Sequence, residues 1–146
     1  MDKLIDAMKK VLADTFAMYL KTHYFHWNVE GPDFAQHHGF FGELYEELYG
    51  AVDPIAEHIR AINGYAPGSF GRFSELTSIE DENTVPVALE MYNRLKNDNQ
   101  KVIASLKAAY TIANTVGEDG LANYLQDRLD IHAKHGWMLR ATTARQ

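Results

Sequence analysis

Two carboxylates and one histidine in the first half of the chain have a spacing that suits a shared site. Asp53 and Glu57 are four residues apart, so on a continuous helix their carboxylates lie on one face. His38 precedes Asp53 by fifteen residues, a rotation of only about 60° but roughly 22 Å along a helix axis. One straight helix therefore cannot bring His38 and Asp53 to the same metal ion. Two such helices, antiparallel across a two-fold axis, would bring His38 of one chain toward the carboxylates of the other.

The chemistry of such a site would be that of a divalent metal. Imidazole and carboxylate ligands with open positions suit Fe(II), but zinc tolerates similar ligands, so residue type alone leaves the metal open. A two-iron site inside one helical bundle uses Glu-x-x-His on two helices. No histidine in this sequence has a glutamate three positions before it. We therefore expect no conventional two-iron site within a single chain.

Hydrophobic periodicity predicts four long helices that would position these residues. Their expected ranges are about 3–29, 34–63, 86–117 and 118–142. Asp81, Asn83 and Thr84 are candidates for capping the third helix, with Pro86 in its first turn and Val87 on its apolar face. No run alternates as a strand would, and no internal repeat is present. The predicted fold class is all-α.

The connection between the second and third helices is unusually long and rich in turn-forming residues. It covers about residues 64–84, and we expect a short helical turn near 73–76. Four long helices with one long middle crossover match the ferritin-like bundle connectivity. An up-down bundle with a loose middle loop is the alternative, and the crossover is favoured because neighbouring helices need only a few linking residues.

The second helix has a low intrinsic propensity. Gly39, Gly42 and Gly50 each cost about 0.5–1 kcal/mol relative to alanine, and Pro54 costs roughly 3 kcal/mol more. Such a helix needs packing to hold it, and glycines allow another backbone to approach closely. We expect this helix to press against a neighbour, for which a second copy of itself is one candidate. Alternatively, Asp53 and Pro54 form the cap and first turn of a restarted helix.

Composition excludes several classes of protein. The chain has 146 residues, no cysteine and a formal charge of −6. This length suits one domain, over residues 1–146. Without cysteine there are no disulfides, thiolate metal sites or thiol nucleophiles. No apolar run approaches a membrane span of about 20 residues, and no signal peptide is evident. We expect a cytoplasmic domain without a membrane partner, and the acidic charge argues against nucleic acid.

Several motifs resemble those of the Dps mini-ferritin family. They are His26-Trp27-Asn28-Val29 with Gly31-Pro32, then His38, then Asp53-x-x-x-Glu57, and finally His132-x-Lys134-x-x-Trp137-Met138-Leu139-Arg140. The match extends over about residues 3–142. Successive intervals of twelve, fifteen and four residues separate His26, His38, Asp53 and Glu57. These intervals agree with the ligand set of the family.

The resemblance implies a specific function. Dps proteins are four-helix bundles assembled as hollow homododecamers, with ferroxidase sites at two-fold interfaces. They oxidise Fe(II), typically with hydrogen peroxide, store ferric mineral and so limit oxidative damage. Carried over by position, His26 and His38 of one chain and Asp53 and Glu57 of its neighbour would bind iron. Trp27, beside a ligand, would supply electrons and quench radicals during peroxide reduction, or pack at the subunit interface.

The sequence departs from the family pattern in two places. The family commonly has a carboxylate one turn after the second histidine, and here that residue is Gly42. A second iron would therefore lose one ligand. Many DNA-protecting members also have a Lys-rich tail before the first helix, whereas here the helix is expected to begin almost at Met1. Twelve chains of −6 each would carry a formal charge of −72, which opposes DNA association, although magnesium bridging would permit it.

Each assignment has a simpler alternative. His26 could be a packed core histidine, and Glu57 could be solvated or paired with Arg60. We expect His37 to lie at the surface or behind the site, and His58, His132 and His135 to be structural. At the level of function, the alternatives are a catalytically weak Dps-like shell or nucleoid-associated protein, suggested by Gly42, and a histidine phosphotransfer bundle.

Overall fold

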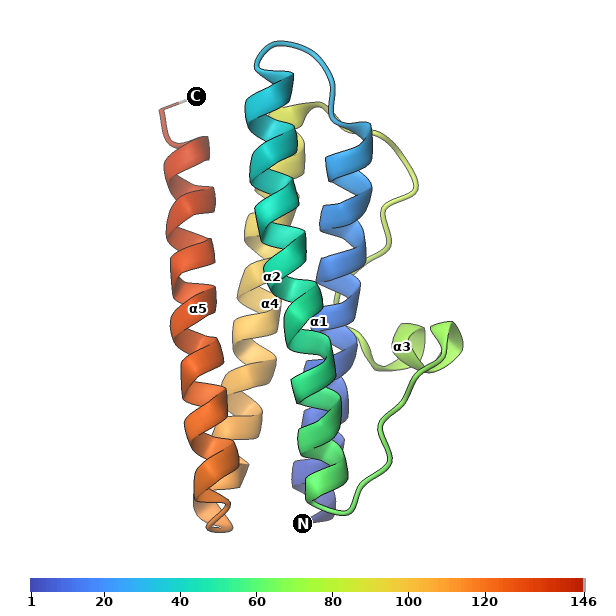
Figure 1. Ribbon diagram of the computed structural model, residues 1–146, viewed down its shortest axis with the longest axis vertical. Helices are drawn as coiled ribbons and strands as arrows, with labels where there is room; N and C mark the ends of the chain where they lie inside the picture. The colour runs from blue at the N-terminus through green and yellow to red at the C-terminus, as the bar shows by residue number, and fades with distance from the viewer. Residues whose placement is uncertain (146) are drawn as a thin grey trace.

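Five α-helices form the computed structural model, which describes residues 1–145 (Figure 1). The long helices are α1 (Asp2–Asn28), α2 (Phe34–Ala61), α4 (Ala88–Thr115) and α5 (Asp119–Thr143). A short helix, α3 (Phe70–Leu76), lies between α2 and α4. No strand occurs within residues 1–145, and none of the helices described there has the length and apolar character to cross a membrane. The prediction of an all-α, four-helix bundle is confirmed.

Helix direction explains the long crossover. In Figure 1, α1 and α5 run upward while α2 and α4 run downward, so that α2 and α4 are parallel. The chain leaves the lower end of α2 and must return along the bundle before α4 begins. Within this connection α3 packs on α1, where the ring of Phe73 stacks on Phe16 at 4.8 Å between centroids. The up-down alternative with a loose middle loop is wrong.

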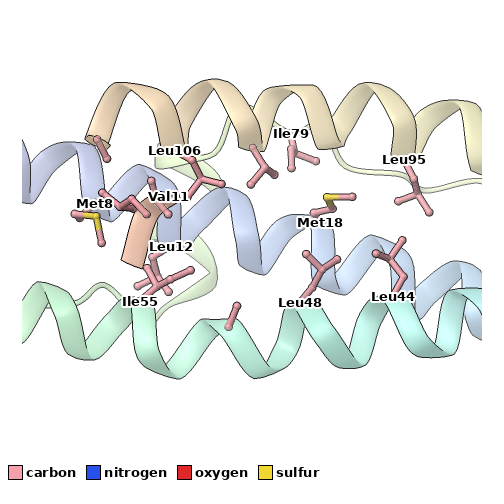
Figure 2. Packing of buried hydrophobic residues seen from close by; sticks show 14 of the residues in the cluster. Met8, Val11, Leu12, Met18, Leu44, Leu48, Ile55, Ile79, Leu95 and Leu106 are labelled. Carbon is pink, nitrogen blue, oxygen red and sulfur yellow. The ribbon is translucent and has the colours of Figure 1, made fainter. Parts of the chain in front are cut away.

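The core lies where α1, α2 and α4 face one another (Figure 2). Met8 and Leu12 of α1 approach Ile55 of α2 at one end of the region shown, while Met18 lies near Leu48 further along. All five side chains are buried. Full burial of an aliphatic side chain contributes about 1.5–3 kcal/mol. This packing stabilises α2 in spite of its glycines and proline.

α2 continues through Pro54 without a break. Proline cannot donate the backbone hydrogen bond that the carbonyl of Gly50 would otherwise accept, four residues earlier. Ala51 and Ile55 on either side are buried, so contacts with the core hold this turn in place. The alternative in which Asp53 caps a restarted helix at Pro54 is therefore wrong. His38 and Asp53 lie on one continuous helix.

The C-terminal end of α2 is closed by Asn63 and Gly64, as predicted. Asn63 has a left-handed φ of 71°, and the Gly64 N–H donates to the carbonyl of Ile59 at 2.9 Å. A Cβ on Gly64 would lie only 2.7 Å from Cγ2 of Ile5. Glycine therefore lets the end of α2 approach α1 closely.

The expected start of the third long helix is wrong. α4 begins at Ala88 with Val87 as its N-cap, and no side chain there makes a capping hydrogen bond. Pro86 precedes the helix, and Val87 is exposed rather than part of an apolar face. The proposed capping residues Asp81, Asn83 and Thr84 all lie in the irregular segment before it. Thr84 donates its backbone N–H and its hydroxyl to Glu82 instead, and its carbonyl accepts from the Tyr24 hydroxyl of α1.

A buried carboxylate attaches the crossover to the bundle. Asp14 of α1 is fully buried and accepts hydrogen bonds from the hydroxyl of Thr77 and the backbone N–H of Ser78, both at 2.7 Å. The hydroxyls of Ser78 and of Ser105, on α4, also donate to it. One side chain thus joins α1, α4 and the residues that follow α3.

We predict that Asp14→Ala lowers the free energy of unfolding by roughly 2–3 kcal/mol, because buried donors lose a charged acceptor. Urea unfolding followed by circular dichroism measures the change. Asp6→Ala removes an exposed carboxylate from the same helix and should change stability by less than about 0.5 kcal/mol. Equal effects of the two substitutions would contradict the role of Asp14.

Candidate functional site

His26 and His38 form a reciprocal pair where α1 ends and α2 begins. Nδ1 of His26 lies 2.7 Å from the carbonyl oxygen of His38, and Nδ1 of His38 lies 2.7 Å from the carbonyl oxygen of His26. The rings stack with centroids 3.7 Å apart. A carbonyl can only accept, so each Nδ1 donates, and an imidazole that donates from Nδ1 alone has a lone pair on Nε2. A hydrogen bond from one ring nitrogen to a backbone carbonyl is the contact that orients metal-binding histidines.

Local structure produces this pair. The turn between α1 and α2 contains Gly31 with a φ of 99°, which returns the chain so that α2 packs beside α1. The ring of Phe34, at the start of α2, stacks on His38 with centroids 5.1 Å apart. Both histidines are half-buried. The alternative in which His26 is a packed core histidine is therefore unsupported, because its ring stacks on His38 rather than within the apolar core.

Gly42 lies directly against this pair. A Cβ at this position would lie 3.1 Å from Cε1 and 3.2 Å from Nδ1 of His26, closer than ordinary van der Waals contact. The absence of a side chain thus leaves room for the His26 ring against α2. It also leaves the site without the carboxylate that the family resemblance would place here.

Asp53 and Glu57 lie far from His26 and His38 of their own chain. Both are exposed on α2, and because the helix is continuous, His38 and Asp53 are separated by roughly 22 Å along its axis. Within residues 1–145 of one chain, no three histidine, aspartate or glutamate side chains come together in a group that could hold a metal ion. The assignment of His26, His38, Asp53 and Glu57 to one site therefore stays a prediction, and it requires two chains.

An aromatic cluster covers the adjoining face of α1 and α2. We use this name for Tyr19, His23, Trp27, Tyr45 and Tyr49. His23 lies at its centre, stacked on Tyr45 with centroids 3.7 Å apart and tilted against Trp27 at 4.1 Å. The Tyr19 hydroxyl lies 3.1 Å from Nδ1 of His23. Trp27 and Tyr49 are each 59% exposed, so this face presents large aromatic rings to solvent in a single chain.

His23 was missed by sequence reasoning. Its signal was the helical spacing to Tyr19, four residues before it, and to Trp27, four residues after it. Burial, reinforced by the neighbouring His26, lowers the pKa of His23. The ring is therefore neutral near neutral pH, and in the tautomer that carries the proton on Nε2 its Nδ1 accepts a hydrogen bond from the Tyr19 hydroxyl.

His58, His132 and His135 lie in structural hydrogen bonds or ring contacts, as expected, whereas His37 is half-buried and contacts α4. His37 bonds the hydroxyl of Tyr92 at 2.8 Å, and burial raises the pKa of Tyr92 to about 12. His132 is fully buried and bonds Asn99 of α4 at 2.8 Å. Burial, followed by the charge of Arg128, keeps the pKa of His132 well below its usual range. His58 packs against the ring of Tyr124.

Glu47 links α2 to α5 on the side of α2 away from the aromatic cluster. It pairs with Arg128 through two hydrogen bonds at 2.5 and 3.0 Å, and with Nε2 of His135 at 2.7 Å. Burial alone would raise the pKa of this carboxyl. The hydrogen bonds from His135 and Arg128 and the charge of Arg128 outweigh burial and lower the pKa to about 2.

The chain matches known proteins along almost its whole length. The family model described as "Ferritin-like domain" matches residues 5–145. A DNA protection during starvation protein from Brevibacillus brevis is 33% identical over 134 residues, which cover 92% of this chain and 90% of that protein. General stress protein 20U of Bacillus subtilis is 33% identical over 143 residues, covering 96% and 97%. The crystal structure of Dps from Staphylococcus aureus superposes with a TM-score of 0.95 at 27% identity, covering 100% of this chain and 98% of that chain.

We predict an acid-dependent stability contribution from Glu47. A carboxyl whose pKa is lowered by folding stabilises the folded state at pH values above its ordinary pKa of 4.5. This contribution is lost as the pH falls toward about 2. After allowance for solvent screening, Glu47→Gln should cost about 1–2 kcal/mol at pH 7. The deficit should shrink steadily below pH 4.5.

The measurement is the free energy of unfolding of both proteins across this pH range. Glu43→Gln, an exposed glutamate one turn earlier on α2, is the matched control and should differ little from the unsubstituted chain at any pH. A Glu47→Gln deficit that does not depend on pH would contradict the assigned ion pair.

Proposed function

Since this chain belongs to the Dps branch of the ferritin-like family, we propose that it oxidises Fe(II), with hydrogen peroxide as the favoured oxidant, and stores Fe(III). The proposal includes a hollow homododecamer built from two-fold dimers, with one ferroxidase site at each end of the dimer contact. Iron is here the substrate and the cargo. The physiological outcome would be iron storage together with protection from peroxide.

The observation that supports this proposal best is the reciprocal pair of His26 and His38. Each ring is oriented by the other residue's backbone carbonyl, and each has an Nε2 lone pair with no bonding partner among residues 1–145. The two oriented imidazoles are two of the four ligands of the proposed iron site. Asp53 and Glu57, which are exposed on α2, are the other two, and the partner subunit contributes them.

The geometry of α2 supports a two-fold arrangement. The midpoint between positions 38 and 53 falls between residues 45 and 46, so an axis at that height would place each His38 opposite the Asp53 of the other chain. Gly42, Tyr45 and Tyr49 lie on the helix face between these two ends. An exposed aromatic face at the predicted contact is typical of an association surface. Burial of Trp27 and Tyr49 there would stabilise the dimer.

The ligand set suits oxidation of iron. Two carboxylates balance the two positive charges of Fe(II), and the same negative charges favour the additional positive charge that develops when Fe(III) forms. The neutral imidazoles complete a mixed ligand set of the kind that iron accepts with positions left open for an oxidant. The formal charge of −6 per chain would attract cations toward the shell. By the same argument we expect weak DNA association or none.

Of the two alternatives, one retains a specific observation in its favour. Gly42 removes one ligand from a second iron position, so a catalytically weak shell or nucleoid-associated protein is the second candidate. A histidine phosphotransfer bundle needs an exposed histidine. None of the seven histidines is exposed in this chain, so nothing favours that function.

We predict that the double substitution Asp53→Asn with Glu57→Gln slows peroxide-dependent Fe(II) oxidation by at least about tenfold, because the site loses both anionic ligands. Loss of Fe(II) is followed by stopped-flow absorbance under anaerobic conditions, with peroxide as the only oxidant.

The control combines Asp6→Asn with Glu90→Gln, which removes the same charge from exposed positions elsewhere on the chain. It should react as the unsubstituted protein does. Both variants are compared at equal assembly size, determined by light scattering. Equal rates in the two double variants would overturn the site assignment and favour the weak-shell alternative.

A further inference from the structure

The proposed site supplies fewer electrons than the reduction of hydrogen peroxide consumes. Reduction of hydrogen peroxide to water takes two electrons, whereas one Fe(II) gives one. Because Gly42 has no side chain, the four ligands suffice for one iron and leave a second iron position without its usual carboxylate. A site that binds one Fe(II) needs a second electron from elsewhere, or it releases hydroxyl radical.

The aromatic cluster connects this site to an oxidisable phenol. The His26 ring lies 5.2 Å from Tyr45, between centroids, and Tyr45 is stacked on His23 at 3.7 Å. The Tyr19 ring lies 5.6 Å from His23 and 6.2 Å from Tyr45. Every step from His26 to Tyr19 is therefore a contact between neighbouring rings. Electrons cross such contacts far faster than an enzyme turns over.

Tyr19 differs from the other oxidisable rings of the cluster in having a base beside it. Its hydroxyl lies 3.1 Å from Nδ1 of His23, within the range for direct proton transfer. A phenol becomes strongly acidic when it loses an electron, so a nearby base makes its oxidation easier. Among residues 1–145, neither Tyr45 nor Tyr49 has such a partner. Trp27 is 59% exposed and likewise has none within the described chain.

We propose that Tyr19, hydrogen bonded to His23, supplies the second electron when hydrogen peroxide reacts with a single Fe(II) at the His26–His38 site. The proposal rests on the proposed ferroxidase function and specifies how its one-iron site avoids releasing hydroxyl radical. Tyr19 acts through the cluster and does not contact the substrate. His23 positions it and receives its proton.

Electrons and protons balance in the proposed step. Fe(II) and the Tyr19 phenol each give one electron, and hydrogen peroxide accepts both as its O–O bond breaks. Two protons from solvent convert the two oxygens into two water molecules. The phenol proton moves to Nδ1 of His23. The products are Fe(III), two waters, a Tyr19 phenoxyl radical and protonated His23.

The test mixes assembled protein anaerobically with one Fe(II) per chain and an equal amount of hydrogen peroxide, then freezes the sample for electron paramagnetic resonance. Protein containing ring-deuterated tyrosine identifies the radical as tyrosyl by the narrowing of its signal. A spin trap in a parallel sample reports hydroxyl radical. Tyr19→Phe keeps the ring and removes the phenol hydroxyl, and Tyr65→Phe, at an exposed tyrosine outside the cluster, is the control.

We expect the unsubstituted protein and Tyr65→Phe to give the tyrosyl signal, and Tyr19→Phe to lose it and release more spin-trapped hydroxyl radical. His23→Gln keeps a hydrogen-bond acceptor without a base, and it should diminish the signal while the assembly and thermal unfolding stay unchanged. A structural role for Tyr19 would not produce this result. The same radical yield in Tyr19→Phe, or no tyrosyl signal in protein that oxidises Fe(II), would overturn the proposal.

The two proposals fail in different ways. If the unsubstituted protein does not oxidise Fe(II), the ferroxidase function itself is wrong. If it oxidises Fe(II) in a manner that depends on Asp53 and Glu57, but the radical does not depend on Tyr19, only the electron-supply proposal is wrong.

Discussion

The continuity of α2 through Pro54 is the constraint on which the proposed site depends. A break at that point would have turned Glu57 away from the helix face that holds Asp53, and the continuous helix keeps both carboxylates on one face. The core contacts of Leu48, Ala51 and Ile55 instead hold the helix in one piece. His38 and Asp53 are therefore about 22 Å apart, and a site that contains both must be shared between two chains.

The two sides of α2 differ in their contacts. One side packs in the core of the bundle and is joined to α5 by the ion pairs of Glu47 with Arg128 and His135. The other side holds Tyr45 and Tyr49 of the aromatic cluster and leaves Tyr49 largely exposed, with Asp53 exposed one turn further along. Internal packing thus compensates for the poor helix propensity of α2, and its free side remains available for association. The reciprocal histidine pair lies at one end of this free side.

Much of this account could be predicted from sequence, because helical periodicity and the spacing of His26, His38, Asp53 and Glu57 are properties of position along the chain. The start of α4 could not, since Thr84 bonds Glu82 and Tyr24 rather than capping a helix. Other missed features join residues distant in sequence. Asp14 and Ser105 are 91 positions apart, and Glu47 and Arg128 are 81. Spacing within one helix cannot reveal such pairs.

Complementation between subunits tests the shared site most directly. One variant lacks both histidine ligands (His26→Ala with His38→Ala), and the other lacks both carboxylates (Asp53→Asn with Glu57→Gln). Each site is proposed to take its histidines from one chain and its carboxylates from the other. When the two variants assemble at random in equal amounts, half of the two-fold dimers are mixed, and each mixed dimer holds one complete site out of two. About a quarter of all sites should therefore be complete. Peroxide-dependent Fe(II) oxidation that is clearly faster in the mixture than in either variant alone is the predicted result. No recovery in co-assembled shells would contradict the account.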